Sequence, residues 1–267
     1  MIQQILRFLT KISFRVYCEI WKIKGLEIVD EKGPIIIMAN HPNSFLDAVI
    51  IGAFYRRKIH FMARGDVFKN WFINKLLRSF GLIPIHRIRE GIQYMSKNSE
   101  SFSEAVNILE KNGIVLIFIE GICLNKHELQ PFKKGTVRIL EQCQERGFYP
   151  RLHLAGIAYH DFREIRKKVN LQLKKIASIK IGEISERKKF NEIVYKELES
   201  LIEVPDYHPK TRGLYWLSPY KWYFLIFNPI IKKRFYKTVF YDSVLFLIVF
   251  FLGTLFHFFL LFTLFFL

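Results

Sequence analysis

The feature that most constrains the fold is an alternation of short apolar runs with longer helical stretches between residues 34 and 202. The runs are bounded by turn residues, which is typical of buried strands. Strands separated by helices predict an α/β fold with a mostly parallel sheet flanked by helices. The predicted strands span residues 34–40, 58–64, 82–87, 114–120, 151–159 and 171–184. The predicted helices span residues 44–55, 70–80, 91–111, 135–146 and 186–202.

The N-terminal end has a different pattern. Residues 2–22 gather apolar side chains on one face of a helix and basic side chains on the opposite face. The basic side chains are Arg7, Lys11, Arg15 and Lys22. This arrangement predicts an amphipathic helix that lies in the membrane interface, because its charges recur too often for a span. A helix packed on the surface of the domain is the alternative.

The C-terminal end is the most apolar part of the chain. Residues 244–267 carry no formal charge and are long enough to cross a ~30 Å hydrocarbon core as a transmembrane helix; a buried core helix is the alternative. Residues 214–231 are aromatic but contain two prolines and a lysine, so we expect them to lie in the interface. Basic residues at 232–237 place the domain on the cytoplasmic side by the positive-inside rule, and we expect the bacterial inner membrane.

These patterns predict three parts of the chain. Residues 1–28 are expected to form the interfacial amphipathic helix, residues 29–213 the α/β domain, and residues 214–267 the membrane-associated and transmembrane segment. The formal net charge of +17 favours anionic partners, which are nucleic acid, anionic lipid headgroups or phosphorylated small molecules. The apolar tail selects membrane lipids from these classes, and no nucleic-acid-binding motif is present.

Several classes of site are disfavoured by the sequence. The three cysteines, Cys18, Cys123 and Cys143, are too few and too scattered for a disulfide framework or a zinc site. His153 and His160 have no clustered carboxylates or thiols, so we predict no metal site. The Gly-x-Ser-x-Gly motif, the P-loop and the dinucleotide fingerprint are absent, which disfavours hydrolases, kinases and dinucleotide-binding enzymes.

The segment from Ala39 to Asp47 contains the first candidate catalytic residues. His41 follows the first predicted strand, and open parallel sheets bind ligands beyond the carboxyl ends of their strands. Asn43 or Ser44 is expected to cap the following helix. Asp47, about one turn into that helix, is placed to contact the imidazole. A carboxylate on one ring nitrogen raises the basicity of the other, which makes a general base.

This segment resembles motif I of the glycerophospholipid acyltransferase family, in which Asn-His is followed by four residues and Asp. Here five residues lie between His41 and Asp47, as in a branch of the family that includes yeast-type glycerol-3-phosphate acyltransferases. Residues 61–64 and 81–87 resemble motif II, with Arg87 ending its Gly-x-x-x-Ile-x-Arg pattern.

The remaining motifs follow in family order. Residues 117–121 and 129–138 resemble motif III and its downstream helix, and residues 154–159 take the place of motif IV without its proline. Motif III lacks the Thr-Arg-Ser of the family after Gly121 and has Ile122-Cys123-Leu124 instead, so its phosphate-binding arginine is missing. The resemblance covers roughly residues 30–185.

The resemblance implies a catalytic pair and a set of substrate-binding residues. His41 and Asp47 are the expected catalytic residues. Guanidinium groups bind phosphate oxygens bidentately, and lysines add charge. Glu120 either holds the hydroxyls of the acceptor or braces its loop, and Cys123 is expected to be a packed residue with no nucleophilic role. The expected substrate-binding residues are Arg64, Arg87, Glu120, Gly121, Lys133, Lys134 and Arg138.

The predicted function is therefore membrane-bound acyl transfer. The donor is expected to be acyl-CoA or acyl carrier protein, with no further cofactor. Lysophosphatidate is the first-choice acceptor, glycerol-3-phosphate the second, and a lysolipid without phosphate, such as an aminoacyl lipid, the third. A non-catalytic membrane adaptor that binds anionic lipid is the rival from another class, and a basic nucleic-acid module is the third class.

Overall fold

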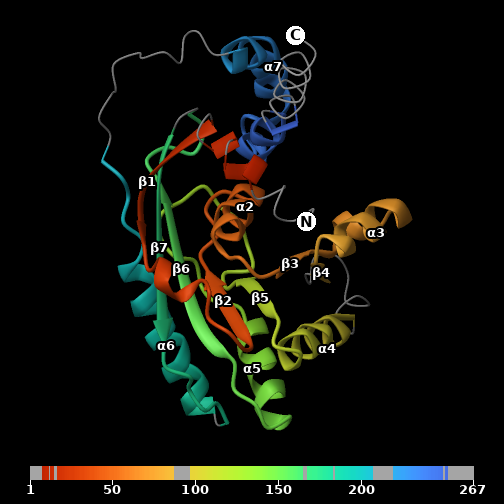
Figure 1. Cartoon of the computed structure of the whole chain (residues 1–267), viewed down its shortest axis with the longest axis vertical. Helices are drawn as coiled ribbons and strands as arrows, with labels where there is room; N and C mark the ends of the chain where they lie inside the picture. The colour runs from red at the N-terminus through yellow and green to blue at the C-terminus, as the bar shows by residue number, and fades with distance from the viewer. Residues whose placement is uncertain are drawn as a thin grey trace, which may run out of the picture.

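A computed structural model of the chain describes residues 8–11, 13–14, 17–86, 97–164, 167–182, 184–206, 219–248 and 250–251. Seven strands form one sheet in the order β1-β7-β6-β2-β5-β3-β4 (Figure 1). Strands β6 and β7 pair antiparallel, and the other neighbouring pairs are parallel. The strands are β1 Cys18–Lys24, β2 Ile35–Ala39, β3 Ile59–Arg64, β4 Leu82–Ile85, β5 Ile114–Phe118, β6 Arg151–Tyr159 and β7 Lys167–Ile176. The predicted α/β fold with a mostly parallel sheet is confirmed.

Helices cover both faces of this sheet (Figure 1). They are α2 Phe45–Phe54, α3 Trp71–Ser79, α4 Lys97–Glu110, α5 Gly135–Glu145, α6 Ile184–Ser200 and α7 Pro219–Phe235, with short 3-10 turns η1 Leu26–Ile28 and η2 Gly65–Phe68. One core lies between the sheet, α2 and parts of both chain ends, and a second core lies between the sheet and α4, α5 and α6.

Strand β2 shows why both faces are covered. Its five residues are all apolar and fully buried. Ile35, Ile37 and Ala39 enter the core beside α2, whereas Ile36 and Met38 enter the core beside α4, α5 and α6. A strand buried on both faces reads as a continuous apolar run, as parallel sheets require. Because β2 is buried on both faces, its carboxyl end has a fixed position in the sheet, and so has the turn that carries His41.

The helix predicted for residues 2–22 is wrong in its last part. Cys18–Lys24 form strand β1, which pairs in parallel with β7, so the sheet begins inside the segment predicted as residues 1–28. Before it, residues 8–11, 13–14 and 17 are helical. Phe14 and Tyr17 are buried against Phe246, with ring centroids 5.2 and 5.6 Å away, while Phe8 is exposed. The part of the helix that is described therefore packs on the domain through these two aromatic side chains.

The C-terminal segment returns to the same core. After α7, which contains Pro229, residues 241–248 are helical, and Tyr241, Leu245 and Phe246 are buried there. Within the described part of the chain, none of the helices has the length and apolar character needed to cross a bilayer. Residues 252–267, which make up most of the predicted span, lie outside the described residues, as do residues 214–218.

Candidate active site

The residues that carry chemistry follow the carboxyl ends of neighbouring parallel strands. His41 comes two residues after β2, and Glu120 comes two residues after β5. Tyr159 ends β6, and Arg64 ends β3. Because β2 pairs in parallel with both β5 and β6, these ends meet at one edge of the sheet. This edge is the candidate active site.

His41 and Asp47 form the central pair. The Nδ1 atom of His41 lies 2.9 Å from Oδ2 of Asp47, and the Asp47 side chain is completely buried. The turn between β2 and α2 brings the two together although five residues separate them, one more than in the usual motif. The extra residue thus leaves the histidine–carboxylate contact intact.

Two further donors fix the Asp47 carboxylate. The backbone N–H of Asn43 donates to Oδ2 over 2.7 Å, and the Tyr159 hydroxyl donates to Oδ1 over 2.6 Å. Burial, and after it the charge of Asp47, raises the pKa of the Tyr159 hydroxyl well above its ordinary value, so this group remains a donor. With both oxygens engaged, Asp47 cannot turn away from His41, and the imidazole keeps one tautomer.

The turn itself is held by side chains on both sides. Asn40 is buried and exchanges two hydrogen bonds of 2.8 Å with the backbone of Ile157 in β6. Ser44 has a φ of 52°, and its N–H donates to Sγ of Cys123 over 2.9 Å. Ser44 takes the N-cap position, which was one of the two predicted, but its side chain makes no cap bond; the Asp47 side chain instead accepts the Asn43 N–H.

The ring of His41 stacks on Phe118. Their centroids are 3.7 Å apart with planes 12° from parallel, so packing as well as hydrogen bonding orients the imidazole. Since Nδ1 faces Asp47, Nε2 is the nitrogen available to take a proton. Among the residues that the structure describes, no hydrogen-bond partner occupies Nε2. A histidine oriented in this way has the geometry that general-base catalysis requires.

Glu120 braces the backbone of the same turn. Its Oε1 atom accepts the His41 N–H over 3.2 Å, and the side chain is buried. Burial raises the pKa of this carboxyl to about 7, against the opposing effect of the His41 and Gln130 backbone N–H groups. Of the two roles open from the sequence, the structure shows the bracing contact.

The raised pKa gives Glu120 a measurable signature. The folded chain binds this proton more tightly than the unfolded chain, so the free energy of unfolding falls as pH rises from about 4.5 to about 7, by on the order of 3 kcal/mol. We expect Glu120→Gln, which keeps an oxygen for the His41 N–H, to flatten this fall. Denaturant unfolding over a pH series measures it, with the exposed Glu128→Gln as control. An unchanged slope in Glu120→Gln would contradict the assignment.

Lys133, one of the predicted substrate-binding residues, lies beside the turn that follows Glu120. Gly121 has a φ of 60°, and a Cβ added to it would stand 2.7 Å from Cγ of Lys133. The Lys133 stem therefore lies against the turn that follows Glu120, and glycine is the residue that permits this approach. Lys134 and Arg138 lie exposed at the start of α5, one helical turn apart.

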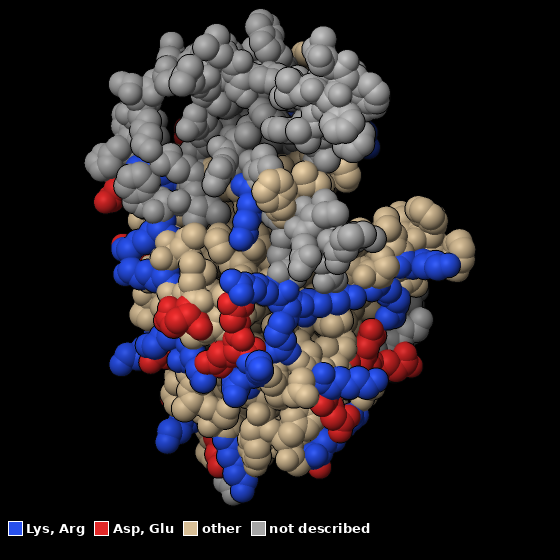
Figure 2. Space-filling view, in the orientation of Figure 1, with Lys and Arg blue, Asp and Glu red and all other residues tan. Residues whose placement is uncertain are grey.

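The predicted arginines of motif II are Arg64 and Arg87, and the structure describes the first of them. Arg64 forms an ion pair and two hydrogen bonds with Asp66, and its guanidinium lies 5.8 Å from the ring centre of Phe240. Its charge is thus partly balanced within the protein. Arg87 lies outside the described residues. Lys and Arg side chains are spread over the face shown in Figure 2, so positive charge alone does not mark the site.

A buried polar cluster, which the sequence did not reveal, lies behind the turn. Asp242, in the helical segment after α7, faces Nζ of Lys167 at 2.5 Å and accepts a hydrogen bond from Nδ2 of Asn43 over 2.5 Å. The Tyr17 hydroxyl donates to the same carboxylate. Asn43 in turn donates its backbone N–H to Asp47. The C-terminal segment is therefore joined to the His41–Asp47 pair through Asn43.

One sequence signal could have indicated this cluster. Asp242 is the single acidic residue after Asp206, and it stands two residues before the apolar tail. A lone carboxylate in an apolar and basic segment needs a buried cation or several donors. Tyr159 carried no comparable signal, because an apolar strand often ends in tyrosine.

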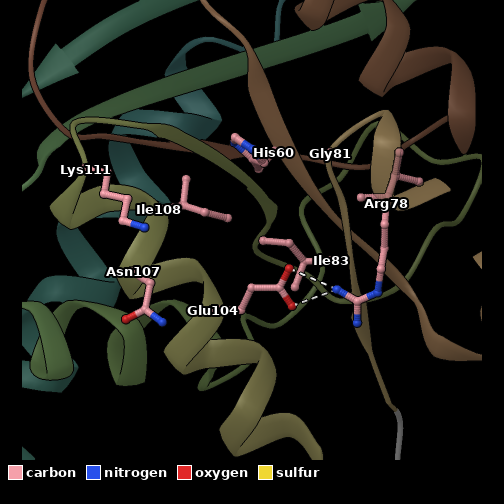
Figure 3. Close-up of a pocket in the computed structure, with 9 residues that line it drawn as sticks. His60, Arg78, Gly81, Ile83, Glu104, Asn107, Ile108 and Lys111 are labelled. Atoms are coloured by element: carbon pink, nitrogen blue, oxygen red, sulfur yellow. Dashed lines mark hydrogen bonds and ion pairs between the residues drawn. The ribbon is translucent and has the colours of Figure 1, made fainter. Parts of the chain in front are cut away.

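A surface hollow lies elsewhere. About 250 Å³ in size, it is lined by Arg78, Glu104, His60 and neighbours, and Figure 3 shows the Arg78 guanidinium pointing at the Glu104 carboxylate. His60 and Ile36 both pair with Val115, so the hollow sits near the amino ends of the strands, ~16 Å along the strands from His41. In the described ranges, no group of three metal-ligating side chains is found.

Comparisons with known proteins agree with this geometry. Residues 21–157, more than half of the 267-residue chain, match the family described as Acyltransferase. No curated protein sequence matches this one. The chain is similar in fold to the crystal structure of the 1-acyl-sn-glycerophosphate (LPA) acyltransferase PlsC from Thermotoga maritima. The TM-score is 0.55 at 18% identity, over 77% of this chain and 81% of that chain. The chain therefore belongs to the Acyltransferase family, the glycerophospholipid acyltransferases that its motifs resemble, and is an acyl-transferring enzyme.

Proposed function

We propose that this enzyme transfers a fatty acyl group from the thioester of acyl-CoA or acyl carrier protein to the hydroxyl of lysophosphatidate. The observation that carries the proposal is the His41–Asp47 pair at the carboxyl edge of the sheet, with Nε2 of His41 available. The solved structure of similar fold is an LPA acyltransferase, which supports the choice of acceptor.

The mechanism starts from Nε2 of His41, because Nδ1 is engaged by Asp47. Nε2 of His41 takes the proton of the acceptor hydroxyl as its oxygen attacks the thioester carbonyl. The C–O bond forms, the C–S bond breaks, and the imidazolium returns the proton to the leaving thiolate. Asp47 holds the ring and stabilises its positive charge, and backbone N–H groups beside it stabilise the tetrahedral oxyanion. No acyl-enzyme and no cofactor beyond the acyl donor are required.

Cations near His41 support a phosphorylated acceptor. Lys133 lies against the Gly121 turn, and Lys134 and Arg138 follow it at the start of α5. A helix start presents free N–H groups that favour an anion. These residues and Arg87 replace, in this proposal, the arginine that motif III lacks. The acidic or phosphorylated surface of either donor also suits a chain of net charge +17.

Two other acceptors remain within the proposal. Glycerol-3-phosphate needs the same cations but no chain-binding surface. A lysolipid without phosphate, such as an aminoacyl lipid, is favoured by Ile122-Cys123-Leu124, which stands where the family has its phosphate-binding arginine. A panel of lysolipids incubated with purified enzyme and labelled acyl-CoA or acyl carrier protein, read by mass spectrometry, decides among them. Absence of every acyl product would contradict the proposal.

We further propose that the enzyme is bound to the bacterial inner membrane with its catalytic domain facing the cytoplasm. The charge-free residues 244–267 and the basic residues before them support this orientation. Flotation of the full chain with liposomes tests the attachment, and a chain left at the bottom of the gradient contradicts it.

A phosphorylated acceptor makes a prediction about KM. We expect Arg87→Ala to raise the KM for lysophosphatidate through loss of a charge-assisted contact worth ~1.5–3 kcal/mol, and Lys133→Ala to do so more weakly. Turnover at saturating acceptor should change less. Lys189→Ala, an exposed site on α6, is the control. An unchanged KM in both variants would point to an acceptor without phosphate or to another cation.

A further inference from the structure

Helix α3 exposes a face that most helices bury. None of its residues, Trp71–Ser79, is buried, and Trp71 and Phe72 are 74% and 66% exposed. At 100° per residue, Phe72, Ile73 and Leu76 share one face with Phe80, which follows the helix, and all four are exposed. Single exposed apolar residues are ordinary, but a contiguous helical face of this size marks an interaction surface.

The polar side of α3 is already engaged with the protein. Arg78 donates to Glu104 of α4 over 3.0 and 3.1 Å (Figure 3). It also donates to Asn74 over 3.1 Å. At the other end, the Asn70 side chain caps the helix by accepting the N–H groups of Phe72 and Ile73. The helix is thus oriented by its polar side, and its apolar face is left pointing away from α4.

The charged side chains of α3, and of the residue Lys69 just before it, are all basic. Between Asp66 and Glu90 the sequence contains no acidic residue, and Lys69 and Lys75 are exposed. The ammonium of Lys75 lies 5.5 Å from the ring centre of Trp71. Figure 2 shows α3, projecting at the right, as mainly uncharged surface with basic side chains along one flank. Two copies of this face would repel each other, whereas a surface of anionic headgroups complements it.

The helix also stands at the catalytic edge. It follows η2, which continues directly from the carboxyl end of β3, the same edge at which His41 leaves β2. Figure 1 shows α3 extending outward from that edge. Phe45, the first residue of α2 and close in sequence to His41, is exposed too.

We propose that α3 is a membrane-docking helix that rests its apolar face in the headgroup region of an anionic bilayer. Phenylalanine, isoleucine and leucine enter the boundary between headgroups and acyl chains, and lysines at the rim contact anionic headgroups. The contact holds the catalytic edge at the lipid surface, where a lysolipid and an acyl product reside. This reason for docking rests on the proposed function, but the lipid contact itself does not.

The test places a reporter on the face itself. The full-length Phe72→Cys chain is labelled with an environment-sensitive maleimide dye and mixed with phosphatidylcholine–phosphatidylglycerol liposomes that carry nitroxide on the acyl chains. Ile184→Cys, equally exposed at the start of α6, is the matched control. The unsubstituted chain, whose Cys18 and Cys143 are buried, gives the background labelling.

We expect the dye at residue 72 to be quenched several-fold more than the dye at residue 184, with emission shifted to shorter wavelength. Equal quenching at the two positions would overturn the proposal. A shift of the emission without nitroxide quenching would also overturn the proposal. The dye would then be buried against protein, such as a second copy of the chain, and not against lipid. No turnover is measured, so loss of the proposed acyl transfer would leave this result unaffected.

A second pair of variants tests the anionic part of the proposal. In the labelled Phe72→Cys chain, we expect Lys69→Glu/Lys75→Glu to lower the quenching several-fold. Lys188→Glu/Lys189→Glu, an exposed pair on α6, should leave it unchanged. Quenching that persists in the first pair, or that is equal in liposomes of phosphatidylcholine alone, would overturn recognition of an anionic surface.

Discussion

His41→Ala is expected to lower turnover by ~10²–10⁴-fold, the range that a positioned general base contributes. The ring is held by Asp47 on one side and by Phe118 on its face, so the substitution removes a proton acceptor whose position is fixed. Acyl transfer by the purified variant, measured at saturating donor and acceptor, gives the effect. Asp47→Asn should be nearly as damaging, because the amide cannot stabilise the imidazolium and permits the wrong tautomer.

A second histidine provides the control for this experiment. His60 is also partly buried and also lies on the sheet, but near the amino ends of the strands. We expect His60→Ala to keep its turnover within a small factor. If His41→Ala retained more than about a hundredth of the wild-type rate while remaining folded, general-base catalysis by this residue would be wrong.

The parallel sheet and its catalytic edge were predictable because both are local patterns. Each strand is a short apolar run that ends at a turn, and the carboxyl ends of parallel strands converge by geometry alone. His41, Glu120 and Lys133 could therefore be assigned to one region before any coordinates. A contact between the His41 ring and Asp47 was also expected, since only about one turn of backbone separates them.

Partners distant in sequence could not be predicted in the same way. Tyr159 reaches Asp47 across 112 residues, and Asn43 reaches Asp242 across 199. No periodicity links such positions, and each side chain alone reads as ordinary core or surface. The sequence of a single chain shows that a carboxylate such as Asp242 needs a partner, but not which residue supplies it.

The N-terminal error has a different cause. The seven residues Cys18–Lys24 alternate apolar and polar side chains in part, while they also continue the helical pattern of the residues before them. A window this short supports both periods. Pairing with β7 decided in favour of the strand, and β7 lies about 150 residues away, so the deciding interaction was not local.

Asp242→Ala is expected to have the second large effect, on stability and activity together. The variant would leave the Lys167 ammonium buried without its counter-charge, a loss that typically costs about 3–5 kcal/mol. Burial raises the pKa of the Asp242 carboxyl and lowers that of the Lys167 ammonium, so the two charges depend on each other. Denaturant unfolding of the full chain in detergent measures the loss. Asp30→Ala breaks an exposed pair with Arg56 and should cost at most about 1 kcal/mol.

A double variant separates positioning from folding. Lys167→Met/Asp242→Leu removes both charges and fills their volume with apolar atoms, which is often neutral or stabilising. The amide of Asn43 would nevertheless lose its acceptor, and Asn43 is the residue whose N–H holds Asp47. We therefore expect the double variant to regain most of the stability lost in Asp242→Ala while its turnover stays reduced several-fold, with the KM for the acceptor little changed. Full recovery of turnover would show that the cluster only stabilises the fold. A persistent loss would show that the C-terminal segment sets the geometry of the His41–Asp47 pair, because both buried charges are gone while the Asn43 amide still lacks its acceptor.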